Sequence, residues 1–188
     1  MPSSLLLLAA LLASSGGSLL ERILAVVDGR PVLLSEARTV EALRGVTRQQ
    51  AVDALVDESL MVREAAQMPQ AEPQARELDA ALQGLLERWP EKEGPAPRPA
   101  LLELARRQLR ILKYVEFRFR PKVRVEESAV RDAYEAEVHG RPGDPGFEAA
   151  AAELQARLER RRLDEEVESW VKELRSAAEI RYNPDLAE

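Results

Sequence analysis

The 188-residue chain contains no cysteine and a single histidine, and aromatic residues make up only 4% of it. The absence of cysteine excludes disulfide frameworks, zinc ribbons, iron–sulfur clusters and thiol nucleophiles. A histidine-rich metal site or a Ser–His–Asp triad would have to be built around His139 alone. His139 stands beside Gly140 in a turn-rich segment with no companion motif, which favours a solvated loop histidine over a catalytic base. We therefore expect no catalytic residue, no metal and no cofactor.

Basic residues are also fewer than acidic ones: the chain has 27 Lys and Arg residues and 33 Asp and Glu residues, which gives a net charge of −6. Proteins that bind nucleic acids usually present a basic patch, so this balance argues against nucleic acid as a partner. The three arginines at 160–162 are interpreted as a solvated helix face, because acidic residues follow them one turn away. Asp53, Asp57 and Glu64 share one helix flank, but the sequence marks no desolvated cleft that would make them an acid–base pair.

The first charged residue is Glu21, and the segment before it has the layout of a secretory signal. Leu5–Ala13 is an unbroken apolar run, and residues 14–18 are all serine or glycine. As a helix this run would span about 14 Å, roughly half of a hydrocarbon core of about 30 Å, so it is too short to cross a membrane. We interpret residues 1–18 as a signal peptide, although its start lacks Lys and Arg, and a buried N-terminal helix is the alternative. The mature chain, 19–188, is then expected to be exported without stable membrane insertion.

The mature chain predicts a mainly α fold with a small antiparallel sheet. Residues 23–27 and 30–34 are apolar runs on either side of the Asp28–Gly29 pair, which is a strong signal for a two-residue hairpin turn. Pro31 cannot donate a hydrogen bond to a neighbouring strand, so the second strand is expected at the edge of the sheet. A lone hairpin is marginally stable in water. The alternating segment 179–183 is the best remaining strand, so we predict a sheet that joins the two ends of the chain.

A bundle of about six helices is predicted from apolar residues at helical spacing, from capping residues and from Pro and Gly breaks. The expected spans are Ser35, as an N-cap, to about Arg44; Thr47, in a capping box, to about Met68; Glu72 to Trp89; Ala100 to about Arg120; Glu126 to Val138; and Phe147 to about Ala178. The residues expected to be buried by the fourth helix are Leu101, Ala105, Leu109, Leu112 and Val115.

Four segments, taken in order, resemble a known family of periplasmic chaperones. They are ERILAVVDGRPVLLSE (21–36), AVDALVDESLMVREA (51–65), RQLRIL (107–112) with RPKVRVEESAVRDAY (120–134), and WVKELRSAAEI (170–180). They are similar to the N-terminal hairpin, the central helix, the exit from the N-terminal domain, and the returning helix and strand of SurA-type chaperones. The resemblance implies ATP-independent binding of unfolded or nascent exported proteins, such as outer-membrane-protein precursors, and it leaves the oligomeric state open.

The chain departs from this family at one place. In the family, one or more parvulin prolyl-isomerase domains lie before the returning helix, whereas here the gap is residues 139–146, eight residues that reach at most about 29 Å when extended. Eight residues cannot form a catalytic domain, and the parvulin pocket uses paired histidines and a Cys or Asp. The resemblance therefore implies one SurA-like chaperone domain, 19–188. Its expected parts are the hairpin and helices 19–138, the short loop 139–146, and the returning helix and strand 147–188.

Four apolar side chains are the candidate client-binding residues: Met61, Met68, Trp89 and Trp170. Methionine is unbranched and adapts to varied apolar partners, and each tryptophan offers a large contact surface. Core burial is the alternative for all four, and for methionine it is the commoner situation. Two other functions are left open by the sequence: a prolyl isomerase with a degenerate site, and an assembly subunit dedicated to one partner.

Overall fold

The computed structural model describes residues 21–184, so the signal peptide predicted at 1–18 lies outside the described residues. Its strands are β1 (Ile23–Val27), β2 (Arg30–Leu33) and β3 (Ile180–Tyr182). Its α-helices are α1 (Leu34–Arg44), α2 (Arg48–Ala65), α3 (Ala75–Glu87), α4 (Arg98–Phe119), α5 (Glu127–Glu137) and α6 (Phe147–Ala177). Short 3-10 helices follow α2, α3 and α4: η1 (Pro69–Ala71), η2 (Glu91–Glu93) and η3 (Arg120–Lys122). The predicted mainly α class, with a small antiparallel sheet, is confirmed.

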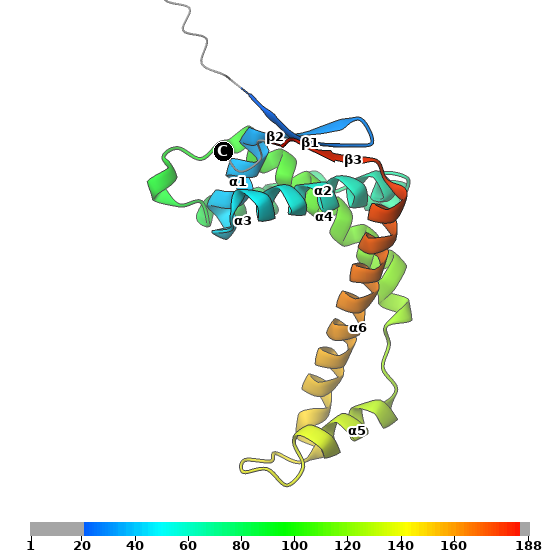
Figure 1. Cartoon of the computed structure of the whole chain (residues 1–188). Coiled ribbons are helices and arrows are strands. Elements are labelled where there is room, and N and C mark those ends of the chain that lie inside the picture. The colour runs from blue at the N-terminus through cyan, green and yellow to red at the C-terminus, as the bar shows by residue number, and fades with distance from the viewer. Residues whose placement is uncertain (1–20, 185–188) are drawn as a thin grey trace, which may run out of the picture.

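The elements form a head and an arm that meet at an angle (Figure 1). The head consists of the sheet and α1–α4, and the arm consists of α5 and α6. Helix α6 begins at the far end of the arm, where it packs against α5, and returns to the head beside α2 and α4. The last turn of α6 then leads directly into β3 (Figure 1).

The sheet joins the two ends of the described chain, as predicted. Its strand order is β2-β1-β3, and β1 pairs antiparallel with both neighbours. Across β1 and β3, Val27 lies opposite Ile180 and Ala25 lies opposite Tyr182. The turn residues Asp28 and Gly29 have φ values of 47° and 81°, the left-handed conformation that a type I′ turn requires at both central positions. Strand β2, which carries Pro31, is an edge strand, so this prediction is also confirmed.

Side chains reinforce the junction between the hairpin turn and β3. The Asp28 carboxylate accepts a hydrogen bond from the Glu179 backbone N–H at 2.8 Å and pairs with Arg63 of α2. These contacts, the Glu179 bond first, lower the pKa of Asp28. The Tyr182 hydroxyl donates a hydrogen bond of 2.8 Å to Asp53, also on α2. The head therefore clamps the C-terminal strand through both its backbone and its side chains.

The start of α1 differs from the prediction. The N-cap is Leu33, because β2 runs into the helix without an intervening residue, and Ser35 already lies in the first turn. The Glu36 carboxylate caps the helix instead by accepting the Leu33 N–H at 3.1 Å. The Ser35 hydroxyl donates to Glu21, which links the segment that precedes β1 to α1.

The start of α2 is confirmed, while its end lies earlier than expected. Thr47 Oγ1 accepts the Gln50 N–H at 3.3 Å, and Gln50 Oε1 accepts the Thr47 N–H at 3.0 Å, as the capping box requires. The helix ends at Ala65 rather than near Met68, because Pro69 begins the 3-10 helix η1 there.

Helix α6 contributes apolar side chains to two different cores. Its first half packs against α5 in a cluster that includes Val130, Tyr134, Leu154 and Leu158. Its second half joins a cluster with α4 and the end of α2 that includes Ala65, Tyr114, Phe119 and Trp170. The apolar stripe of the helix loses its phase at residues 160–162, between the two cores. The change of phase follows from a change of packing partner along one continuous helix.

A chain that ends at Ser176 is expected to lose cooperative unfolding. It lacks β3, the packing of Ile180 on the core of the head, and the bond from Glu179 to Asp28, and the two-stranded hairpin that remains is marginal by itself. Circular dichroism across a urea gradient measures the transition. A chain that ends at Pro184 is the control and should keep the transition. An unchanged transition in the shorter chain would show that β3 contributes nothing to the fold.

Candidate client-binding surface

Three of the four candidate client-binding residues come together where the arm meets the head. Met61 and Met68 are partly buried and pack against a cluster that contains Trp170. Trp89 lies apart from them and packs against a separate cluster between α3 and α4. The four residues therefore do not form one surface.

Trp170 is a core residue, which is the alternative that the sequence left open for it. Its side chain is only 4% exposed. Its ring stacks on Tyr114, with the ring centroids 5.2 Å apart, and is tilted against Phe119 at 5.5 Å. Both partners belong to α4, so Trp170 attaches the arm to the head.

The other three candidates, Met61, Met68 and Trp89, are partly buried. Met61 and Met68 fill the space beside Ala65 and Ala71, in the ordinary core position that methionine favours. The indole N–H of Trp89 donates to the Gly94 carbonyl at 3.0 Å. The polar edge of the Trp89 ring is therefore hydrogen-bonded to the proline-rich loop that follows α3.

An apolar groove that the sequence did not indicate lies between α3 and α4. It is a hollow of about 270 Å³ lined by Ala81, Gly84 and Leu85 from α3, by Arg88 at the C-cap of α3, and by Ala105, Gln108, Leu109 and Leu112 from α4. We call this hollow the α3–α4 groove. Leu112 was expected in the core but is 53% exposed. Three of the lining positions are alanine or glycine, and these small residues leave the space that larger side chains would fill.

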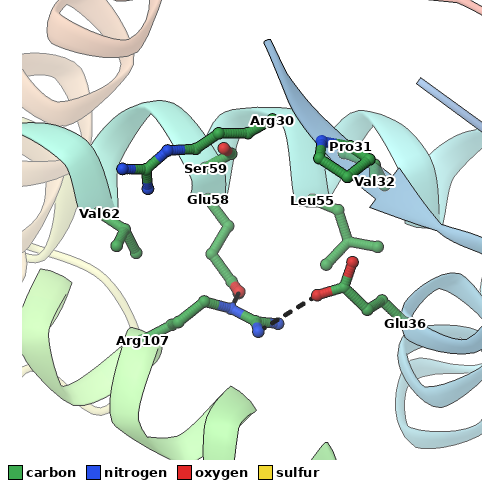
Figure 2. A pocket seen from close by; sticks show the side chains of 9 residues that line it. All are labelled: Arg30, Pro31, Val32, Glu36, Leu55, Glu58, Ser59, Val62 and Arg107. Atoms are coloured by element: carbon green, nitrogen blue, oxygen red, sulfur yellow. Dashed lines mark hydrogen bonds and ion pairs between the residues drawn. The ribbon is translucent and has the colours of Figure 1, made fainter. Parts of the chain in front are cut away.

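A second hollow, of about 120 Å³, lies between β2, α2 and α4 and is polar at its floor (Figure 2). Arg107 of α4 pairs with Glu58 of α2, whose side chain is 8% exposed, and its other end lies 3.3 Å from Glu36 of α1. Arg30 points along α2 beside Ser59, away from this ion pair (Figure 2). The charge of the buried Glu58 is already compensated by Arg107. We therefore interpret this site as a structural ion-pair network that links α1, α2 and α4.

The loop between α5 and α6 is folded around Asp144. Its carboxylate accepts hydrogen bonds from the Gly146 N–H at 2.9 Å, the Tyr134 hydroxyl at 2.8 Å and the Gly140 N–H at 3.1 Å. These bonds, that of Gly146 first, lower the pKa of Asp144, and the bond to Asp144 raises the pKa of Tyr134. His139 is exposed and lies 3.6 Å from Asp144. The prediction of a solvated loop histidine is confirmed.

Within residues 21–184, no group of three or more His, Asp or Glu side chains is placed to hold a metal ion. None of the helices in the same range is both long and apolar enough to cross a membrane. No protein-family model matches the chain, and no curated protein is significantly similar to it.

Proposed function

We propose that the protein is an ATP-independent chaperone that holds unfolded apolar segments of other proteins, in the manner of SurA-type periplasmic chaperones. Support comes from the element order: an N-terminal hairpin, a helical head, and a returning helix and strand that complete the sheet. The clients would be unfolded or nascent exported proteins, such as outer-membrane-protein precursors, met in the periplasm.

The observation that carries the proposal is the uncovered α3–α4 groove. A monomeric protein gains stability by covering apolar side chains, yet here Leu112 is exposed at the end of an apolar hollow. Apolar contact is non-directional, so such a surface accepts segments of varied sequence. The small residues of the groove leave room for side chains of different shapes. Broad specificity and modest affinity follow from these two properties.

Filling the groove is expected to reduce client protection without reducing stability. At Gly84, an added Cβ meets nothing within 4 Å, and the residue has helical geometry. Gly84→Leu therefore places a large side chain in the groove while improving the helix propensity of α3 by about 0.5–1 kcal/mol. We expect a severalfold loss in the suppression of aggregation, measured by light scattering on three unrelated unfolded proteins.

Gly84→Ala is the matched control, because it improves helix propensity similarly but leaves most of the groove open. Phe117→Gln is a second control, since Phe117 of α4 is 67% exposed but does not line the groove. Full protection by Gly84→Leu would reject the groove as the client site. Protection of only one of the three proteins would indicate a dedicated assembly subunit instead of a general chaperone.

A further inference from the structure

The α3–α4 groove continues into a smaller hollow of about 110 Å³ where α1, α3 and α4 meet. The two hollows share Leu85, Arg88 and Gln108. Arg44, from the last turn of α1, is the second guanidinium at this junction. One end of an apolar groove therefore carries two arginines that come from different helices.

Neither arginine is neutralised within the part of the chain that the structure describes. Among residues 21–184, no ion pair includes Arg44 or Arg88, and none of the side chains that line the two hollows is a carboxylate. Arg88 Nε donates to the Gly84 carbonyl at 3.0 Å, and its terminal nitrogens have no hydrogen-bond partner among the described residues. By contrast, the guanidiniums of Arg107 and Arg175 are paired with carboxylates of α2. The junction is thus a local excess of positive charge in an acidic protein.

We propose that the groove selects apolar client segments that carry an Asp or Glu side chain, and that Arg44 and Arg88 bind this carboxylate. This inference rests on the proposed function, because it names the kind of segment that the groove receives. A guanidinium presents its N–H groups in a planar fork that matches the two oxygens of a carboxylate. The amide of Gln108, which lines both hollows, is placed to add a further donor.

The lining beyond the arginines indicates a side chain rather than a chain end as the source of the carboxylate. Past the arginine pair, the partly exposed side chain of Leu43 offers one further apolar contact, while Val40 and Leu104 beneath it are buried. A segment whose carboxylate lies in its interior reaches the α3–α4 groove on one side of the charge and Leu43 on the other. A C-terminal carboxylate would leave Leu43 without an apolar partner.

A purely structural role for the two arginines makes a different prediction. Both residues lie at the C-terminal ends of helices, where positive charge stabilises the helix dipole. That role requires no ligand, and it does not distinguish a peptide with Glu from one with Gln. Peptide selectivity is therefore the measurement that separates the two roles.

The test uses the full chain and fluorescent apolar peptides of about ten residues, acetylated and amidated at their ends, with Glu, Gln or Lys at the same central position. We expect the Glu peptide to bind about fivefold more tightly than the Gln peptide at low salt, the effect of about 1 kcal/mol for a solvent-accessible charge pair. The Lys peptide should bind most weakly, and added salt should reduce the differences. In Arg44→Gln/Arg88→Gln, the Glu and Gln peptides should bind alike.

Arg76→Gln is the matched control, because Arg76 is an exposed arginine of α3 that lines neither hollow. This variant should keep the selectivity for the Glu peptide.

Equal binding of the Glu and Gln peptides to the unaltered protein would overturn the inference, and so would selectivity that survives in the double variant. A Gln peptide with a free C-terminus that binds as tightly as the Glu peptide would assign the arginines to a chain end. If all peptides bind without selectivity and Gly84→Leu abolishes their binding, only the carboxylate inference fails. If none binds, the proposed function fails with it.

Discussion

Replacing Trp170 with alanine is expected to lower the free energy of unfolding by about 3–5 kcal/mol, the usual cost of removing a large aromatic side chain from a core. Trp170 is buried, and its ring contacts the rings of both Tyr114 and Phe119 of α4. The cavity would lie at the point where the arm meets the head, so the surrounding helices can close it only by moving the whole arm. Urea unfolding followed by far-UV circular dichroism measures the loss.

Two comparisons separate the packing role of Trp170 from the client-binding role that its residue type suggested. Trp170→Phe keeps an aromatic ring between the same partners and should lose clearly less stability than the alanine variant. Client protection, measured where Trp170→Ala is still folded, should equal that of the unaltered protein. An alanine variant with full stability but impaired protection would restore Trp170 as a binding residue.

Replacing Arg107 with methionine is the second change with a large expected effect. Glu58 would lose the cation that compensates its burial, while methionine fills a similar volume without charge. Breaking a buried ion pair from one side typically costs 3–5 kcal/mol. Arg107 is itself partly exposed, which lets water reach the pair, so we expect a loss of about 3 kcal/mol, at the lower end of that range. Thermal and urea unfolding at neutral pH provide the measurement.

The double variant Arg107→Met/Glu58→Leu tests the cause of this loss. It removes both charges from the interface between α2 and α4, so most of the stability should return. Arg120→Met is the surface control, because the pair between Arg120 at the start of η3 and Glu116 near the end of α4 is exposed, so its loss should change stability little. If the double variant is as unstable as Arg107→Met, packing by the arginine stem, and not the unpaired carboxylate, determines the loss.

The sheet shows how much of this fold could be predicted from short-range patterns in the sequence. Asp28–Gly29 dictates a tight turn because only a few residue types tolerate two positive φ angles, and Pro31 excludes one edge from further pairing. The partner strand 180–182 is 150 residues away, yet it was predicted, because a lone hairpin needs a further strand and few others were available. The capping box at Thr47 likewise depends on contacts within one turn.

The binding surface could not be predicted in this way. Helical periodicity tells which residues share a face, so it correctly aligned Leu112 with Leu101 and Ala105. Whether such a face is covered depends on where the neighbouring helix ends and how large its side chains are. Opposite Leu112 the small Ala81 and the glycine at position 84 leave a groove, and Leu112 stays exposed. The four candidate residues were chosen by residue type, which carries no information about burial.

The chain's own residues determined the mainly α class, the order of its helices and strands, and the closing of the sheet, because these depend on backbone preferences and short-range periodicity. Tertiary packing alone decided that Trp170 is buried, that the space between α3 and α4 is open, and that Arg44 and Arg88 face one hollow from two helices. Side chains from different helices meet only when helix crossing and side-chain volume are settled together. No local pattern contains that information.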